Sequence, residues 1–556
     1  MGLLDKTVVV KVGAAVMLLM GATASAEPDP WASPPKPVSP KLRGPDPERG
    51  VPPTDLVLPA VPAFELPVVS GGARGVRELR ILGRPLLDTD VRVDGYVTWI
   101  YDCTKALRRP GQALASVHRS IDRDPTQCER AKLYLGDRPD TPPEASLWVV
   151  DVPRPFNKLE LERIDKRDRT VDNYPDRCEP DPKRPRAPIC APVAVGDFVT
   201  VTGRFAQSSP HRERNSDGLI VLRSITAATP PSATSTLMRR PTPTAPRTSP
   251  ALAPLPAKAV ERPPASDAEG QASIQASNHG TRAYGQRKYA DAIAAYQDAV
   301  ARWDGNHVAW YGLAGAYIGQ QDWANAQKAM ARAFELAPDA PMYAMVYGYA
   351  TYEATIHAAK EAAARRDGVS IDHVHPDLAT ADFRHAEQLL RHAIKREPSL
   401  WRAHYYLGRI YRDTERPLEA AKALTEALRF APSQVAPWIA LAELYRKWEY
   451  VEQARTVASA GLRYTKDIAD LWYVLGMVAD DQGDSARAID AFTEALAARP
   501  GHPQALFQRG QAYARTKQTK LARRDLEAFL AKPGSSASFA IQQANQRLLD
   551  LAAKRR

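Results

Sequence analysis

A pattern of small and aromatic residues recurs every 34 residues in the second half of this 556-residue chain. The clearest unit begins at His307 and marks one face of each of two helices by Trp310, Leu313, Ala314 and Tyr317, then Ala326, Met330 and Ala333, before Pro338. A fixed period of this length predicts stacked helical hairpins, because a single hairpin cannot bury its apolar face alone.

Seven units carry the pattern, beginning near residues 273, 307, 341, 401, 435, 469 and 503. The unit that begins near residue 401 holds Leu407, Gly408, Tyr411, Ala420, Leu424, Ala427 and Pro432 at the corresponding positions. This arrangement resembles the tetratricopeptide repeat (TPR) family. The resemblance implies an all-α solenoid over residues 269–536 with a concave groove, and a non-enzymatic adaptor or scaffold that binds protein or peptide partners there.

Two units depart from the pattern. The first has Asp304 in place of the closing proline, as a weak terminal repeat would. In the third, we expect an over-long first helix and an insertion at residues 354–380, because the second-helix positions arrive late. Residues 537–556 are expected to hold a helix that caps the stack.

The amino terminus reads as a secretory signal at residues 1–26, with lysines at Lys6 and Lys11, an apolar run from Val12 to Ala22, and small residues before Glu27. We therefore expect an exported protein, periplasmic or in the cell envelope, with no membrane span after cleavage. The alternative is an uncleaved anchor, since Val8 to Val10 lengthen the apolar stretch across Lys11.

Two proline-rich stretches, 27–75 and 229–268, are expected to be disordered linkers. All four cysteines, Cys103, Cys128, Cys178 and Cys190, fall between them. For an exported chain this predicts disulfides. Three pairings are open, with a preference for neighbours in sequence, and a zinc site is the weaker alternative because no short Cys-x-x-Cys pair occurs.

The residues between the linkers, 76–228, change to a period of two. Alternation around Val91 to Tyr101 predicts a strand with Gly95 at a bend, and further strands are expected at 131–135, 147–152, 198–205 and 219–225. Five strands with a bent first strand resemble the OB-fold, a small all-β barrel.

OB barrels commonly bind oligonucleotides or sugars, so the resemblance implies an alternative function as an envelope glycan- or polyanion-binding protein. The candidate residues are Tyr96, Trp99, Tyr101, Tyr134 and Trp148 with Arg204, Arg212 and Arg214. We favour the interpretation that Trp99, Tyr134 and Trp148 belong to the barrel core. Nucleic acid is not expected as a partner of an exported protein.

In TPR stacks the groove is lined by first-helix residues. The matching candidates here are Arg402, Tyr405, Tyr406, Arg409, Arg412, Arg446, Lys447 and Tyr473. They predict a basic, aromatic groove for an acidic or carboxylate-ended peptide. The alternative is that these charges only keep the surface soluble.

Enzyme signals are not found: the sequence has no glycine-rich phosphate loop, Gly-x-Ser-x-Gly or His-Glu-x-x-His motif. The histidines His373, His375, His385 and His392 lie near the insertion but lack matched ligand spacing, so no metal and no cofactor is expected. The net charge of +11 is scattered among acidic residues along both halves.

Overall fold

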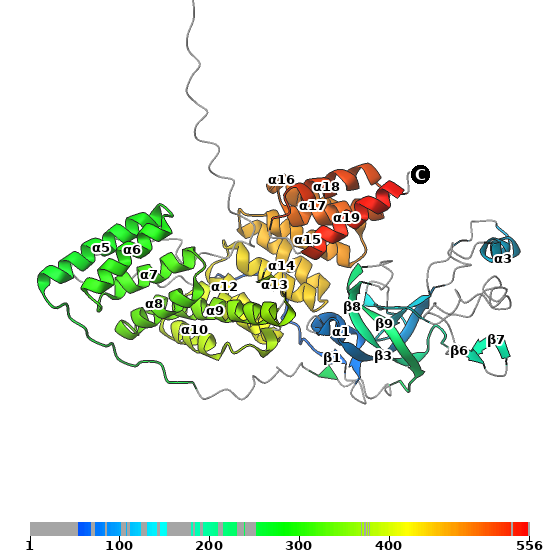
Figure 1. Cartoon of the computed structure of the whole chain (residues 1–556), viewed down its shortest axis with the longest axis horizontal. Coiled ribbons are helices and arrows are strands. Elements are labelled where there is room, and N and C mark those ends of the chain that lie inside the picture. Colours follow the sequence, from blue (N-terminus) through cyan, green and yellow to red (C-terminus); the bar gives the residue numbers. More distant parts are fainter. Residues whose placement is uncertain are drawn as a thin grey trace, which may run out of the picture.

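The computed structural model describes residues 54–67, 73–83, 86–101, 107, 112–123, 131–141, 145–152, 179–181, 184–189, 193–208, 215–230, 238–239, 252–368, 370–371, 374, 376, 378–534 and 538–553. The cysteines, the signal segment, His373, His375, Arg212 and Arg214 lie outside these residues, so the disulfides and the signal stay predictions. Figure 1 shows a barrel beside a long stack of helices.

The barrel consists of five strands, β3 (Asp90–Ile100), β4 (Lys132–Gly136), β5 (Leu147–Val150), β8 (Phe198–Ser208) and β9 (Asn215–Ala227). Each strand pairs with the next in the order β3, β4, β5, β9, β8, and β8 closes the barrel on β3. The β5–β9 pair is parallel and the others are antiparallel. This closed, OB-like barrel confirms the predicted fold class of the amino-terminal half.

Valine and leucine side chains from alternate strand positions fill the barrel, among them Val93, Val97, Leu135 and Val149. Gly95 comes directly before Tyr96, where β3 passes from pairing with β8 to pairing with β4. The register with β4 then shifts between Val97 and Trp99. An added Cβ at Gly95 would lie 2.9 Å from Val76. Gly95 therefore permits close packing of the short helix α1 (Val76–Leu82).

Shorter elements flank the barrel. They are β1 (Leu66–Pro67), β2 (Arg74–Gly75), α3 (Leu114–Arg123), β6 (Glu179–Asp181), β7 (Arg184–Ile189) and β10 (Met238–Arg239). β1 pairs with β10, and β2 adds to β3 in parallel.

The second half is a stack of helix pairs that follow one another along the molecule (Figure 1). The pairs are α5 (Asp267–Gly285) and α6 (Tyr289–Arg302), α7 (His307–Gly319) and α8 (Trp323–Leu336), α9 (Pro341–Asp367) and α10 (Arg384–Arg396), α11 (Trp401–Asp413) and α12 (Pro417–Phe430), α13 (Val435–Lys447) and α14 (Val451–Tyr464), α15 (Ala469–Asp481) and α16 (Ser485–Ala498), α17 (Pro503–Arg515) and α18 (Thr519–Ala531), with α19 (Ser538–Ala553) after them.

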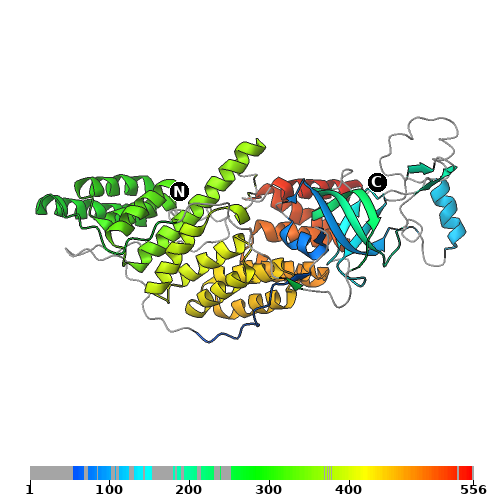
Figure 2. The same cartoon turned by 90° about the horizontal axis from the view of Figure 1, so that it is seen from below.

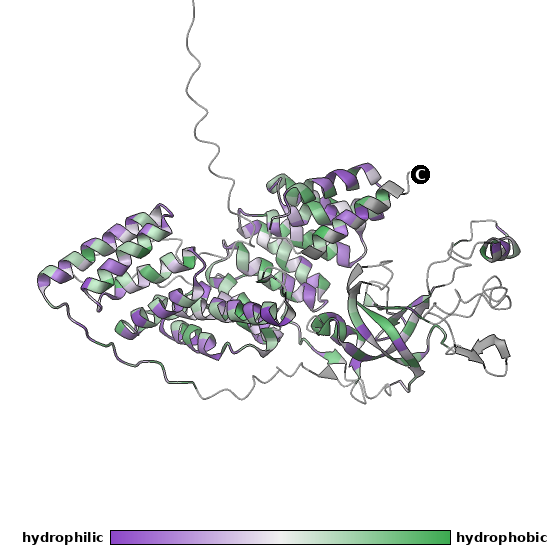
Figure 3. Cartoon of the chain, viewed as in Figure 1, coloured by the Kyte–Doolittle hydropathy of each residue, from purple (hydrophilic) through white to green (hydrophobic). Residues whose placement is uncertain are grey.

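Small residues bring the two helices of a pair together. An added Cβ at Gly408 would lie 2.6 Å from Leu424 Cγ, and one at Gly476 would lie 2.4 Å from Phe492 Cε1. Each large side chain thus occupies the space that a missing Cβ leaves, which is the reason for the small-large periodicity. Figure 3 shows hydrophobic and hydrophilic residues mixed along the helices, as one buried and one exposed face require.

The turn from first to second helix repeats the same backbone geometry. Its middle residue has a positive φ in Arg287, Gln321, Glu415, Glu449, Gly483 and Lys517. In the third pair the helix α9 continues to Asp367 and ends at Gly368, whose φ is 65°. Figure 2 shows α9 projecting beyond its neighbours.

Residues 54–67 and 252–266, which belong to the two proline-rich stretches, pack on the stack, although the sequence predicts disordered linkers there. The Thr54 amide donates to Arg429 O at 2.6 Å, and the Val260 amide donates to Glu335 O at 3.0 Å. The side chains of Leu56, Leu58 and Leu255 pack against the core of the stack. Apolar residues between the prolines explain this difference, because the stack leaves apolar surface that they cover.

Candidate functional site

The first helices α11, α13 and α15 carry all eight predicted groove residues, and we call the surface they share the first-helix face. At its amino-terminal end, the guanidinium of Arg402 lies 4.6 Å from the ring centroid of Trp401. Its Nε is buried with no hydrogen-bond partner among the described residues. Lys447, at the end of α13, is exposed.

The sequence predicts that Tyr405 and Tyr406 line the groove, but both side chains are buried in the structure. Tyr406 is fully buried and its ring stacks on Tyr349, with centroids 4.4 Å apart. Tyr405 is 6% exposed and packs between Trp401 and Tyr406. Tyr406 thus fills the junction with the preceding helix pair, and both tyrosines belong to the buried core of the stack.

Three arginines of the first-helix face each meet a carboxylate of the stack. Arg409 Nη1 lies 3.4 Å from Glu353 Oε1, and its guanidinium covers the Tyr352 ring at 4.9 Å. Arg412 Nη2 lies 2.8 Å from Asp413 Oδ1. Arg446 Nη1 lies 3.0 Å from Asp481 Oδ2.

The expected basic groove is therefore a charge-balanced surface. Attraction by Asp413 holds the pKa of Arg412 above its usual range, although burial opposes this. Burial raises the pKa of the Glu443 carboxyl, while Arg412 and Arg446 act in the opposite direction. Glu353 and Asp481, which belong to neighbouring helix pairs, fix Arg409 and Arg446, whereas Arg412 is held by Asp413 of its own helix.

The last predicted residue, Tyr473, is half-buried. Its ring stacks on His502 at 5.2 Å, and burial raises the pKa of its hydroxyl to about 12. His502 Nε2 lies 2.9 Å from Asp470 Oδ1, and its Nδ1 accepts from the Ala505 amide. Tyr473 is thus held in position by the junction between two helix pairs.

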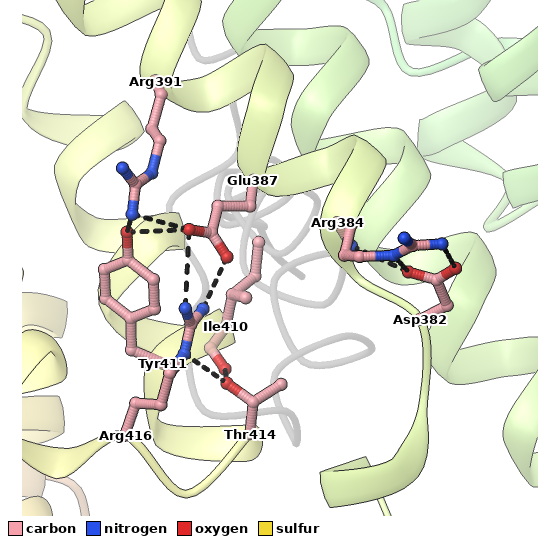
Figure 4. Close-up of polar contacts among 8 residues, drawn as sticks. All are labelled: Asp382, Arg384, Glu387, Arg391, Ile410, Tyr411, Thr414 and Arg416. Carbon is pink, nitrogen blue, oxygen red and sulfur yellow. Dashed lines mark hydrogen bonds and ion pairs between the residues drawn. The ribbon is translucent and has the colours of Figure 1, made fainter. Parts of the chain in front are cut away.

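A polar cluster beside the insertion anchors the fourth pair to the third (Figure 4). Glu387 of α10 receives Arg416 Nη2 at 2.5 Å and Arg391 Nη2 at 2.7 Å. Arg391 also donates to the Tyr411 hydroxyl at 2.9 Å, and Arg416 covers the Tyr411 ring at 4.2 Å. These contacts hold α10 against α11 directly after the irregular stretch of the chain.

The nearby histidines have structural contacts. His385 Nε2 lies 3.3 Å from the Tyr347 hydroxyl, and His392 Nε2 lies 3.3 Å from Pro338 O. In the part of the chain that the structure describes, no group of three or more His, Cys, Asp or Glu residues is placed to hold a metal ion. None of the described helices is long and apolar enough to cross a membrane.

Tetratricopeptide repeat models match the helix stack at residues 283–348, and again at 377–435, 440–503 and 473–537. The carboxy-terminal half of the chain is a TPR domain. This confirms the resemblance seen in the sequence. No curated protein matches the chain.

Solved structures similar to the TPR domain include a chain of the APC/C hetero-tetramer Cut9–Hcn1, with 15% identity and a TM-score of 0.36 over 50% of this chain and 48% of that one. The chain thus spans about half the length of that relative. Pseudomonas aeruginosa pilF has 15% identity and a TM-score of 0.33 over 43% of this chain and 97% of its own. YrrB, titled a TPR protein with an unusual peptide-binding site, has 14% identity and a TM-score of 0.28 over 38% and 95%.

The barrel carries a second candidate surface, the aromatic row, which consists of Trp99, Tyr101, Tyr134 and Trp148. Trp99 and Tyr134 are cross-strand neighbours with centroids 5.0 Å apart, and Tyr134 and Trp148 are cross-strand neighbours at 4.6 Å. Lys132 Nζ lies 5.2 Å from the Tyr101 centroid and 5.3 Å from that of Trp148.

The row corrects the expectation that these rings form the barrel core. Trp148 and Tyr134 pack with Leu219 in a cluster separate from the interior, and Trp99 is 37% exposed. Alternation with Leu133 and Leu135 already places Tyr134 outside. Trp99 was harder to place, because only the register shift after Val97 turns it outward.

The other barrel candidates lie elsewhere. Tyr96 pairs with Phe198 at 4.8 Å, and Arg204 is exposed and bound to Asp88 at 2.6 Å. Neither residue belongs to the aromatic row.

Proposed function

We propose that this protein is an exported, non-enzymatic adaptor that binds protein partners through the first-helix face of its TPR domain. The observation that carries the proposal is the row of ordered arginines on that face. Arg412 and Arg446 keep side-chain exposures of 30% each while a carboxylate fixes one side of the guanidinium. A guanidinium that is already held in place loses little further conformational entropy when it binds a partner.

The partner we propose is an acidic or carboxylate-ended peptide. The hydrogen bonds from Arg446 to Asp481 involve Nη1 alone. A guanidinium has five donors, so a guest carboxylate can bind Nε and Nη2 without displacing Asp481.

The test uses the full chain and two labelled peptides: one rich in glutamate with a free carboxyl end, and its glutamine counterpart with an amidated end. Fluorescence anisotropy should give a dissociation constant about tenfold lower for the acidic peptide, since a hydrogen bond to a charged group contributes about 1.5–3 kcal/mol. R446Q should remove most of that difference.

The matched control is R455Q, because Arg455 of α14 is also ion-paired, to Glu452, but lies on a second helix. It should bind like the wild type. Equal affinity for both peptides, or equal loss in R446Q and R455Q, would contradict an acidic partner.

Export is part of the proposal and has its own test. Protein recovered from the envelope of the producing cell should begin at Glu27, as the small residues before it predict. Mass spectrometry of the intact chain decides this, since an amino terminus at Met1 in a membrane fraction would instead indicate the uncleaved anchor.

A second candidate function is glycan or polyanion binding by the aromatic row. Its exposed Trp99 favours stacking of a sugar ring, and Lys132, which lies against Tyr101 and Trp148, places a positive charge within the same row. The full chain is titrated with a neutral gluco-oligosaccharide and with a sulfated one, and binding should change the tryptophan fluorescence of the wild type. The control variant Y96A, whose altered residue lies outside the aromatic row, should respond in the same way. W99A should lose the response, and a wild type with no response to either sugar would rule the candidate out.

A further inference from the structure

An aromatic box on the TPR domain encloses a side chain from the far end of the chain. The box is formed by Tyr445 in the last turn of α13 and by Trp448 and Tyr450 between α13 and α14. The ring of Phe64 lies 5.4 Å from the rings of both Trp448 and Tyr450 and 6.0 Å from that of Tyr445. Phe64 is 1% exposed.

The residues before Phe64 lie along the stack as a bound peptide would. Thr54 is hydrogen-bonded to Arg429, at the end of α12, and Phe64 contacts Tyr450, just before α14. Between these two points Leu56, Leu58 and Val61 pack on the core. The segment therefore crosses from the end of one second helix to the start of the next (Figure 2).

Charged contacts beside the box reach the stack from the barrel. Arg77 Nη2 donates to Trp448 O at 2.8 Å, and Arg80 Nη2 lies 3.2 Å from Glu449 Oε1. Both arginines belong to α1, whose first amides donate to Asp137 of the barrel at 2.8 and 2.7 Å. The contacts at Glu449 and Trp448 thus fix α1 to the stack, and those at Asp137 fix α1 to the barrel.

We infer that the aromatic box is a binding site for a phenylalanine-bearing extended segment, and that residues 54–66 occupy it to join the barrel and the TPR domain into one non-covalent complex. The occupant is the chain's own segment, because Phe64 fills the box and Leu66 beyond it is fully buried. A covalent connection between the two halves is then not needed to keep them together.

The experiment places a protease recognition sequence between residues 240 and 251 of the full chain, and cuts it after purification. The two halves should co-elute on size-exclusion chromatography. F64A should weaken their association at least about tenfold, since it removes three aromatic contacts. Wild-type halves that separate on cutting would overturn the inference.

Charge variants guard against a result caused by misfolding. E449R should separate the cut halves, and adding R80E should restore part of the association. Q321R is the matched control, because Gln321 holds the same positive-φ turn position in the second helix pair and is exposed. If the cut halves of F64A and E449R associate as tightly as those of the wild type, or if Q321R weakens their association equally, the aromatic box does not join the two halves.

Discussion

Arg509 of α17 forms a two-pronged hydrogen bond with Asp525 of α18: Nε to Oδ2 at 2.6 Å and Nη2 to Oδ1 at 3.1 Å. Asp525 is 2% exposed and Arg509 is 9% exposed. The last helix pair is therefore joined by a buried ion pair as well as by apolar packing.

Removing one partner of this pair should be costly. D525A leaves the Arg509 guanidinium buried without its carboxylate, so the free energy of unfolding should fall by about 3–5 kcal/mol. Urea unfolding followed by circular dichroism measures it. D490A, at an exposed position of α16, should change stability by less than about 0.5 kcal/mol; equal losses would contradict the role given to the pair.

Gly408 should not tolerate even one methyl group. In G408A the new Cβ would lie 2.6 Å from Leu424 Cγ, and the overpacked junction should lose about 1–3 kcal/mol of stability. The control is G501A, because nothing lies within 4 Å of a Cβ there. Thermal melting of both variants checks this, and an unchanged or raised melting temperature for G408A would show that α11 and α12 have room to separate.

His307 should make stability depend on pH. Burial lowers its pKa to about 4, against about 6.5 when unfolded, and its Nδ1 lies 2.8 Å from the Tyr343 hydroxyl. The unfolded state takes up the proton first, so this contribution is intact above pH 6.5 and is lost as the pH falls towards 4. At pH 5 the loss should be about 2 kcal/mol.

The measurement for His307 compares urea unfolding at pH 7.5 and pH 5 in the wild type and in H307Q. The difference between the two pH values should shrink by about 2 kcal/mol in the variant. His404, whose pKa is also lowered by burial, stays in both proteins and supplies the background. An identical pH dependence would mean that His307 is accessible to protons when folded.

Gly305 should control the docking of the second proline-rich stretch. An added Cβ there would lie 1.9 Å from Arg262 O, the same oxygen that accepts a hydrogen bond from Trp303 Nε1 at 2.6 Å. G305A should therefore release residues 252–266 and make them cleavable by trypsin after Lys258, which is not followed by proline, under conditions in which the wild type resists. G285A, with open space around its Cβ, should cut like the wild type.

Local periodicity was sufficient to predict the helices. First helices begin at His307, Pro341, Trp401, Val435 and Ala469, where the units begin in the sequence. The small-large spacing that sets these positions acts within one pair, between residues such as Gly408 and Leu424. Strands were likewise found from alternation, because the inward face of a barrel repeats every second residue.

The candidate sites were less predictable, since their residues meet across long stretches of sequence. Arg409 is balanced by Glu353 from the preceding pair, and Tyr406 is buried by Tyr349. The resemblance to the TPR family identifies the residues of the first-helix face, but it does not identify the residues that contact them, such as Glu353 and Tyr349. Trp99 was placed wrongly because a one-residue register shift reverses the side of a strand on which a side chain lies.

The sequence by itself determined the repeat period, the strand pattern and so the two fold classes, because both patterns repeat over residues that are close in the chain. Only the tertiary structure decided that the arginines are paired, that the aromatic row faces outward, and that Phe64 lies in a box built around Trp448. These depend on how curved layers bring distant segments together, and no local spacing records that geometry.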